Sequence, residues 1–144
     1  MNVYDRDNIF AKILRGEVPS FKVHEDDHTL AFLDIMPRTL GHTLVIPKAP
    51  ARNLLDAPSD ALSRTILAVQ RVAKAAKIAF AADGVTLLQF SEQASGQVVF
   101  HLHFHVLPRY DGIPLLPPQT NMESNETLVP KAAKLRAAIA NLGV

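Results

Sequence analysis

Three histidines alternate with apolar residues between positions 101 and 107, in the order His-Leu-His-Phe-His-Val-Leu. Because successive side chains of a strand point to opposite faces, His101, His103 and His105 are expected to share one face. The apolar residues between them would pack on the core and leave the histidine face open to a ligand. Side chains at i and i+2 start about 7 Å apart, so three imidazoles could converge on one tetrahedral phosphate.

Imidazole is well suited to chemistry at phosphorus. Its reference pKa near ~6.5 would let one histidine act as a neutral nucleophile while a neighbour is protonated at physiological pH. Attack by the central histidine would form a covalent phosphoramidate, which water then hydrolyses. We therefore expect nucleophilic chemistry on a phosphate group.

The histidine row could also be a set of buried core residues or a zinc site. Three core histidines would need several hydrogen-bond partners that this apolar neighbourhood does not offer. A zinc site is the stronger rival, because His-x-His spacing often places two ring nitrogens on one ion. Against zinc, the segment offers no carboxylate near the histidines to hold their other ring nitrogens. We expect chemistry without a metal or another cofactor.

The overall composition is that of an ordinary globular domain. The 144 residues suit one domain, and 15 basic against 14 acidic residues leave no excess charge to follow a nucleic-acid backbone. The absence of cysteine gives weak support to a reducing compartment. The first ten residues lack the apolar core of a signal peptide, and no run approaches membrane-span length. We expect a cytoplasmic protein that binds neither nucleic acid nor a membrane.

The elements that would position the histidines follow from the periodicity of the apolar residues. Strands are predicted over 21–25, 29–34, 41–47, 85–90 and 98–107. Helices are predicted over 9–14, capped by Asp7, over 59–82, ended by Gly84, and from Pro130 to about Asn141. The proline-rich residues 111–130 form an arm that is either ordered or mobile. Five strands around one long helix, mostly with short connections, predict an α+β fold with a mainly antiparallel sheet.

The segment His101 to Leu107 resembles the signature of the histidine-triad family. The resemblance continues, in the expected order, through residues 8–14, 31–35, 41–48 and 96–97, and covers roughly residues 8–109. Its spacing is similar to that of the Hint-like branch, whose members cleave nucleoside phosphoramidates and related AMP-linked compounds through a nucleotidyl-histidine intermediate. The resemblance implies a HIT-like fold over 1–110, with 111–144 in the same domain. It also implies a purine nucleotide substrate and a homodimer whose sheet is continuous across the subunits.

The resemblance implies roles for individual residues. His103 would be the nucleophile, and His105 would contact a phosphate oxygen and help the leaving group depart. His101 and His42 would orient and bind the substrate, and Asp34 would accept hydrogen bonds from the ribose hydroxyls. An apolar slot for the base would be formed by Ile9, Phe10, Ile13, Phe32, Ile35 and Leu44.

The sequence departs from the family pattern in and just before the loop that precedes the histidine segment, at Phe90 and Val98. Gly96 and Gln97 match it, but Val98 stands where a Ser or Thr hydroxyl often touches phosphate, so only backbone amides would help there. Phe90 stands where many relatives carry an Asn that positions the nucleotide. Phe90 and Val98 leave open a nucleotide-binding protein with weakened catalysis. A dinucleoside polyphosphate hydrolase, which uses the same triad, is a further alternative.

Several of these residues also have simpler interpretations. Ile9, Phe10, Phe32 and Leu44 have the spacing of ordinary core residues. Asp34 could be a turn residue before Pro37. His24 and His28 are expected to be solvated. Lys48 and Arg109 could be phosphate contacts or surface charges.

Overall fold

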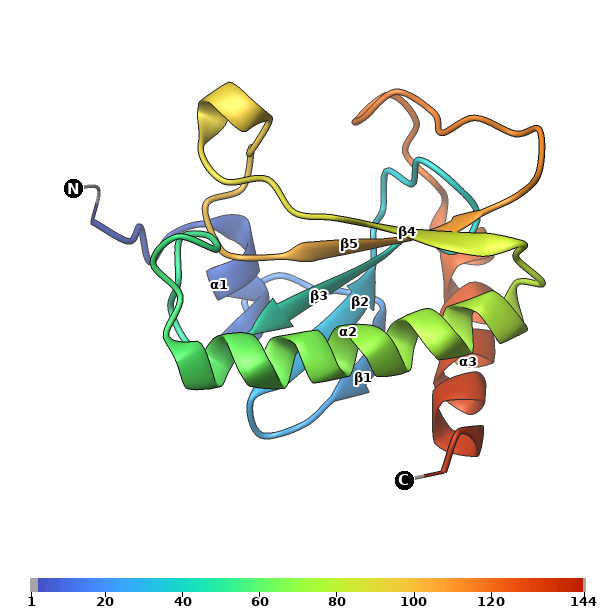
Figure 1. Cartoon of the computed structure of the whole chain (residues 1–144), viewed down its shortest axis with the longest axis horizontal. Coiled ribbons are helices and arrows are strands. Elements are labelled where there is room, and N and C mark those ends of the chain that lie inside the picture. The colour runs from blue at the N-terminus through green and yellow to red at the C-terminus, as the bar shows by residue number, and fades with distance from the viewer. Residues whose placement is uncertain (1–2, 144) are drawn as a thin grey trace.

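The computed structural model describes residues 3–143 (Figure 1). Met1, Asn2 and Val144, which belong to the predicted span 1–144, lie outside the described residues. The elements are, in chain order, α1 (Ile9–Leu14), β1 (Lys22–Glu25), β2 (Thr29–Leu33), β3 (Thr43–Pro47), α2 (Ser59–Ala79), β4 (Gly84–Leu88), the 3₁₀ turn η1 (Gln93–Ser95), β5 (Phe104–Arg109) and α3 (Asn125–Asn141).

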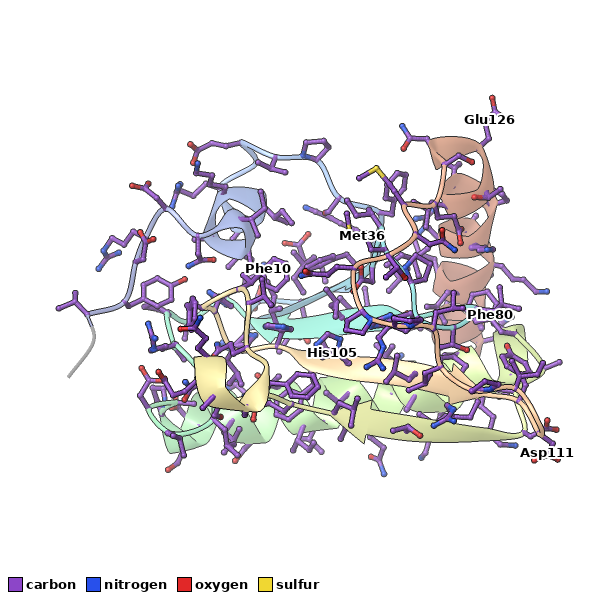
Figure 2. All side chains as sticks on the ribbon, turned by 90° about the horizontal axis from the view of Figure 1, so that it is seen from above. Phe10, Met36, Phe80, His105, Asp111 and Glu126 are labelled. Carbon is purple, nitrogen blue, oxygen red and sulfur yellow. The ribbon has the colours of Figure 1, made fainter. Side chains whose placement is uncertain are left out.

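The five strands form one sheet in the order β1-β2-β3-β5-β4. Every neighbouring pair is antiparallel. Helix α2 crosses one face of this sheet, and α1 lies on the other (Figures 1 and 2). The predicted α+β fold, with its antiparallel sheet, one long helix and two further helices, is confirmed.

The main core lies between the sheet and the two longer helices. It combines apolar residues of α2 and α3 with Leu102, Phe104 and Val106, the side chains that alternate with the histidines. The predicted alternation therefore separates two faces: the apolar residues face the helices, and the histidines face the opposite side. Within the described residues, no helix is long and apolar enough to cross a membrane.

Strand β5 begins later than predicted. The prediction was 98–107, but pairing with β3 starts at Phe104, opposite Val45. Two residues further along β3 is Pro47, which has no N–H to continue the ladder. The chain before Phe104 leaves the sheet, and the Leu102 N–H donates to the Ala51 carbonyl instead. His101 and His103 consequently precede the paired strand.

The ends of the first two helices also differ from the prediction. The side chain that caps α1 is Asn8 rather than Asp7, and it accepts a hydrogen bond from the Ala11 N–H. Helix α2 ends at Ala79 rather than near 82. Gly84 does not end this helix but opens β4, because a turn at Phe80 and Ala81 already breaks the helical conformation.

Helix α3 begins at Asn125, five residues before the predicted start. Pro130 therefore lies inside the helix instead of in its first turn. A proline there removes one hydrogen bond, to the Glu126 carbonyl. Leu128, Ala132, Leu135 and Ile139 of this helix are buried in the main core, so packing outweighs that loss.

Candidate active site

The histidines open onto a cavity of about 590 Å³ on the face of the sheet opposite α2. Figure 2 shows Phe10 on α1 and Met36 of the β2–β3 loop on this side of the sheet. Most of the predicted site residues line the cavity: His42, His103, His105, Asp34, Ile9, Phe10, Ile13, Phe32, Ile35, Leu44, Gly96 and Val98. His101 and Gln97 do not line it; both are buried behind the cavity wall.

His103 is held in the tautomer that a nucleophile needs. Its Nδ1 lies 2.6 Å from the carbonyl oxygen of His101, so Nδ1 carries the proton and donates it to that oxygen. A neutral imidazole has one N–H, and Nε2 is therefore left with a free lone pair. The ring also lies edge-to-face against Phe10, with centroids 4.9 Å apart, and this contact restrains its rotation.

A chain of hydrogen bonds sets the proton positions on His42 and His105. The Arg38 backbone N–H donates to His42 Nδ1 at 3.0 Å, so the His42 proton is on Nε2. His42 Nε2 in turn lies 2.9 Å from His105 Nδ1 and donates to it. The proton of His105 is then on Nε2, and the site offers one imidazole lone pair and one imidazole N–H.

His101 supports the site from below. Its Nε2–H donates to the Pro47 carbonyl at 2.8 Å, and its Nδ1 accepts from the Tyr4 hydroxyl. The ring is completely buried, and its backbone carbonyl is the one that orients His103. The sequence analysis did not identify Tyr4 as a site residue, because it is a lone aromatic residue near the N-terminus and belongs to no motif.

Burial keeps all four imidazoles neutral in the free protein. Loss of solvation lowers the pKa of His42 and of His105 to about 3, and that of His101 to about 4. Burial also lowers the pKa of His103. These lowered pKa values contradict the expectation that one histidine is protonated at physiological pH. Protonation of one of them requires an additional negative charge, which a bound phosphate would supply.

A carboxylate does lie close to the histidines, contrary to the sequence-based argument against a metal. Asp34 Oδ2 is 3.5 Å from His42 Nε2, and Asp34, His42 and His105 place ligand atoms within 4.8 Å of one another. The Asp34 N–H donates to the His42 carbonyl where β2 ends and β3 begins, and this contact brings the carboxylate to the histidines. The histidine segment by itself does not indicate it. The tautomers provide a different argument, because the Arg38 N–H holds the His42 proton on Nε2, the atom a metal would need.

Asp34 itself is positioned by a local turn. One carboxylate oxygen accepts the Met36 N–H at 2.8 Å, while the other faces His42. Burial raises the pKa of this carboxyl group. Asp34 thus has hydrogen-bonding capacity left on the cavity side.

The loop before β5 forms the cavity wall beside His105. The side chain of Gln97 is fully engaged inside this loop: its amide N–H groups donate to the Arg52 and Val99 carbonyls. Its oxygen accepts from Asn53 and from the Glu92 backbone. Gly96, with φ of 111°, provides the turn that brings the loop to the cavity. Gln97 holds the loop, and Gly96 and Val98 reach the cavity.

The apolar end of the cavity is also a small core. Phe10, Ile13, Phe32 and Leu44 are buried against one another, while Ile9 and Ile35 remain partly exposed at its edges. The core interpretation is confirmed for Phe10, Phe32 and Leu44 but is wrong for Ile9, and all of these side chains also line the cavity. Such a surface suits a flat apolar group.

The proline-rich arm supplies residues that the sequence did not predict. Pro118 and Gln119 line the cavity together with Arg38. The Leu116 N–H donates to the Arg38 carbonyl, and Arg38 Nε donates to the Leu116 carbonyl, each at 2.8 Å. The Glu123 N–H donates to the Ile35 carbonyl, also at 2.8 Å. The arm is therefore ordered and packs on the β2–β3 loop.

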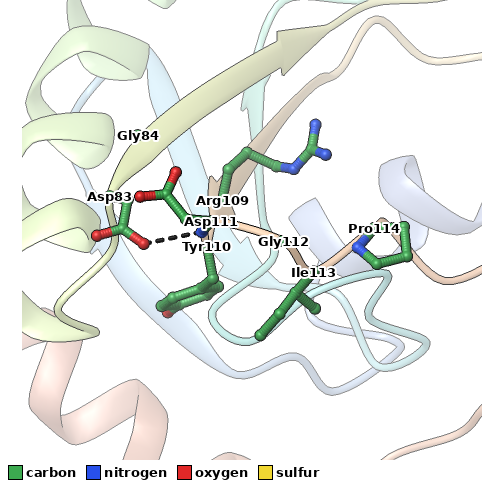
Figure 3. A pocket seen from close by; sticks show the side chains of 8 residues that line it. All are labelled: Asp83, Gly84, Arg109, Tyr110, Asp111, Gly112, Ile113 and Pro114. Carbon is green, nitrogen blue, oxygen red and sulfur yellow. Dashed lines mark hydrogen bonds between the residues drawn. The ribbon is translucent and has the colours of Figure 1, made fainter.

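The remaining candidate cations are elsewhere. Lys48 pairs with Glu25 at 2.9 Å. Arg109 lies beside a separate cavity of about 510 Å³, formed by residues 83–84 and 109–114 at the far end of β4 and β5 (Figure 3). There the Asp111 N–H donates to Asp83, and Arg109 bonds Thr86. Neither cation faces the histidine cavity.

Comparison with known sequences gives a consistent set of relatives. The family model described as the HIT domain matches residues 15–112. "Protein hit" of Bacillus subtilis is 44% identical over 102 residues, which cover 71% of this chain and 70% of that protein. Adenosine 5'-monophosphoramidase HNT1 of Saccharomyces cerevisiae is 41% identical over 103 residues, covering 72% of this chain and 63% of the yeast protein.

A solved structure is similar along nearly the whole chain. The crystal structure of a Hit-like protein involved in cell-cycle regulation from Bartonella henselae superposes with a TM-score of 0.92 at 55% identity. The superposition covers 95% of this chain and 99% of that one. The resemblance includes the arm and α3, which the family match to residues 15–112 does not reach.

Proposed function

This chain belongs to the HIT family, and from that premise we propose that it is a nucleotide hydrolase or transferase. Its proposed substrates are nucleoside 5'-phosphoramidates or related AMP-linked compounds, cleaved through a nucleotidyl intermediate on His103. The yeast relative named as an adenosine 5'-monophosphoramidase supports this substrate class. The observation that carries the proposal is the tautomer of His103, whose bond to the His101 carbonyl frees Nε2 for attack.

The proposed first step is displacement at the α-phosphorus. The Nε2 lone pair of His103 forms a bond to phosphorus, and the bond from phosphorus to the leaving nitrogen breaks. The phosphate charge raises the pKa of His105, so His105 takes up a second proton, on Nδ1, when the substrate binds. His105, whose N–H faces the leaving group, gives a proton to the departing nitrogen.

The proposed second step is hydrolysis of the intermediate. Water attacks the same phosphorus and loses a proton to His105, while the electron pair of the P–N bond returns to His103. The products are AMP and the free enzyme, and the proton taken up with the substrate is released. Before the substrate binds, His42 donates to His105 Nδ1 and so directs His105 Nε2 toward the cavity.

The rest of the cavity suits a purine nucleoside. In the proposed complex the base lies in the slot between Phe10 and Leu44, and Asp34 accepts hydrogen bonds from the ribose hydroxyls. Asp34 lies beside His42, so the ribose would be next to the phosphate site. Phe90 and Val98 line the phosphate end without side-chain donors, and phosphate contacts there fall to backbone amides and histidines.

We also propose that the protein is a homodimer. Strand β4 is at the edge of the sheet, with β5 as its neighbour. Val85 and Leu87 on this strand are partly exposed, as are Ile66 and Ile78 on α2. A second copy pairing along β4 would extend the sheet and cover this apolar edge. Sedimentation equilibrium tests this proposal, since Leu87→Lys should shift a dimeric mass to a monomeric one.

The hydrolase proposal is tested with adenosine 5'-phosphoramidate, by following AMP release. We expect the wild-type protein to release AMP and His103→Ala to lose at least about a thousandfold in turnover. His28→Ala, which removes an exposed histidine outside the cavity, is the matched control and should keep full activity. Mass spectrometry after acid-free quenching should find a nucleotide bound to the wild-type chain but not to His103→Ala.

Two results would contradict the proposal. Equal turnover by wild type and His103→Ala would place the reaction on another residue. AMP binding without turnover of any nucleotide phosphoramidate would instead indicate a nucleotide-binding protein.

A further inference from the structure

Arg38 is a cation at the arm end of the histidine cavity. It follows Pro37 in the β2–β3 loop, and its half-buried side chain lines the cavity with Gln119 of the arm. The Leu116 carbonyl accepts from Arg38 Nε at 2.8 Å and so fixes the direction of the guanidinium group. The Leu116 N–H also donates to the Arg38 carbonyl at 2.8 Å, which holds the two residues together.

Arg38 lines the same cavity as His42 and His105, and its backbone N–H donates to His42 Nδ1. Burial is the main cause of the lowered pKa of both imidazoles, and the positive charge of Arg38 adds to it. Among residues 3–143, no carboxylate forms an ion pair with Arg38, and its two Nη atoms have no hydrogen-bond partner. A guanidinium has five N–H donors, and only one of those of Arg38 is used here.

The other parts of a nucleotide substrate already have partners in the cavity. The base has the apolar slot, the ribose has Asp34, and the reacting phosphate has His103 and His105. The group left without a partner is the one that departs from phosphorus toward His105. Arg38 and Gln119 are polar residues of the cavity lining that none of these parts uses, and Arg38 is bonded to Leu116 of the arm.

We propose that Arg38 recognises a negative charge on the leaving group, and that the preferred substrates are AMP-linked compounds whose leaving portion carries a carboxylate or phosphate. This inference rests on the proposed function and names its substrate class. Guanidinium nitrogens bind such planar or tetrahedral anions with charge-assisted hydrogen bonds. Arg38 acts as a specificity-determining residue, and the arm holds it through Leu116.

The bond changes are those of the proposed hydrolysis. His103 forms the new bond to phosphorus, the bond to the leaving nitrogen breaks, and the amine departs with a proton from His105. The anionic group on that amine stays bound to Arg38 until the amine diffuses away, and it takes no part in the bond changes.

A matched pair of substrates isolates the effect of the charge. Adenosine 5'-phosphoramidate N-linked to glycine carries a carboxylate, and its methyl ester has the same P–N bond without that charge. We expect wild type to have a kcat/KM at least about tenfold higher for the acid, the range of one charge-assisted hydrogen bond. In ADP the bond that breaks is the P–O bond to the β-phosphate, which departs as inorganic phosphate. AMP release from ADP should fall in Arg38→Gln, and equal release by both proteins would restrict the recognised anion to a carboxylate.

Side-chain substitutions at Arg38 leave the backbone N–H that orients His42 in place. Arg38→Gln should abolish the preference, so that the ratio of kcat/KM for the acid to kcat/KM for the ester falls to about one. Arg38→Lys keeps the positive charge but lacks the planar set of N–H donors of a guanidinium, so it should retain part of the preference. Lys131→Gln is the control for a loosened arm, because it breaks the ion pair of Lys131 with Glu123 and should keep the full preference.

Two results would overturn the inference. One is a wild-type protein that does not distinguish the acid from the ester. The other is an Arg38→Gln variant in which kcat/KM falls equally for the acid and the ester. That result would mean that Arg38 only holds the arm in place. Binding of both compounds to His103→Ala, with and without Arg38→Gln, measures the preference without turnover. Loss of turnover with this binding preference intact would therefore count against the hydrolase proposal and not against Arg38.

Discussion

The two faces of the sheet are covered in different ways. One face lies under α2, which is 21 residues long, and the sealed core there extends to α3. The opposite face lies under α1, which has six residues, and under an irregular arm. A short helix and an arm cannot fill the surface that a long helix fills, and the unfilled space is the histidine cavity. Leu102 and His103, which are neighbours in the chain, belong to different faces.

This difference separates stability from chemistry. The helix face contains the apolar side chains that stabilise the fold, whereas the cavity face contains imidazoles kept neutral by burial. The cavity face therefore lowers stability wherever its groups are charged in the unfolded chain, and the helix face offsets that cost.

Acidification should have the largest effect. In the unfolded chain each histidine takes up a proton near pH 6.5, while the folded pKa values of His42, His101 and His105 are about 3 to 4. Between these limits the unfolded state binds more protons, so stability is fully present above pH 6.5 and is lost as the pH falls. Each unit of depression in one pKa is worth about 1.4 kcal/mol, and several imidazoles contribute.

Urea unfolding at a series of pH values measures this loss. His42→Gln should flatten the slope between pH 6.5 and 4, and His28→Gln should not change it. Asp34 acts in the opposite direction, because its raised pKa makes the folded state bind the extra proton first. An unfolding free energy that is constant from pH 7 to 4 would mean that the histidines are not buried as described.

Leu102→Ala and His103→Ala should have opposite effects, although the residues are adjacent. Leu102 is completely buried in the main core, and its truncation should cost about 2–5 kcal/mol of unfolding free energy. His103→Ala should cost much less stability while abolishing turnover. Denaturant titration of both variants, with turnover measured at a temperature where each is folded, checks the contrast. Similar losses of stability in both would contradict the division into two faces.

Gly41→Ala should disturb both faces by a smaller amount. Gly41 has φ of 83°, and an added Cβ would lie 2.4 Å from the Phe80 ring, which belongs to the main core. We expect a loss of about 1–3 kcal/mol from the clash and the backbone strain. Because His42 follows directly, turnover should also fall. Gly112→Ala has a similar φ of 76° but open space around its Cβ, and it separates backbone strain from the clash.

Tyr4→Phe should have the smallest effect. It removes the hydroxyl that donates to His101 Nδ1 and leaves that buried nitrogen without a donor. We expect a loss of about 1 kcal/mol in stability and a severalfold loss of turnover, since His101 orients His103 through its carbonyl. Thermal unfolding and AMP release check both quantities. No change in either would mean that His101 does not need the hydroxyl.

Local patterns predicted most of the fold. The alternation of histidines with Leu102, Phe104 and Val106 correctly separated the two faces, because side-chain direction in an extended chain depends only on position. The element boundaries were less accurate. The start of β5 depends on Pro47 of another strand, and the start of α3 depends on packing that outweighs a proline. Neither influence is local in sequence.

Sequence alone also determined the kinds of residue available for catalysis, since a histidine row can be found by spacing. Only the tertiary structure decided which nitrogen of each ring holds a proton, because the partners are carbonyls and amides of Arg38, Pro47 and His101. It also decided that Asp34 lies beside His42 and that Arg38 is held by Leu116, 78 residues further along the chain. The physical reason is the same in each case: hydrogen bonds and burial depend on distance in space, which sequence separation does not give.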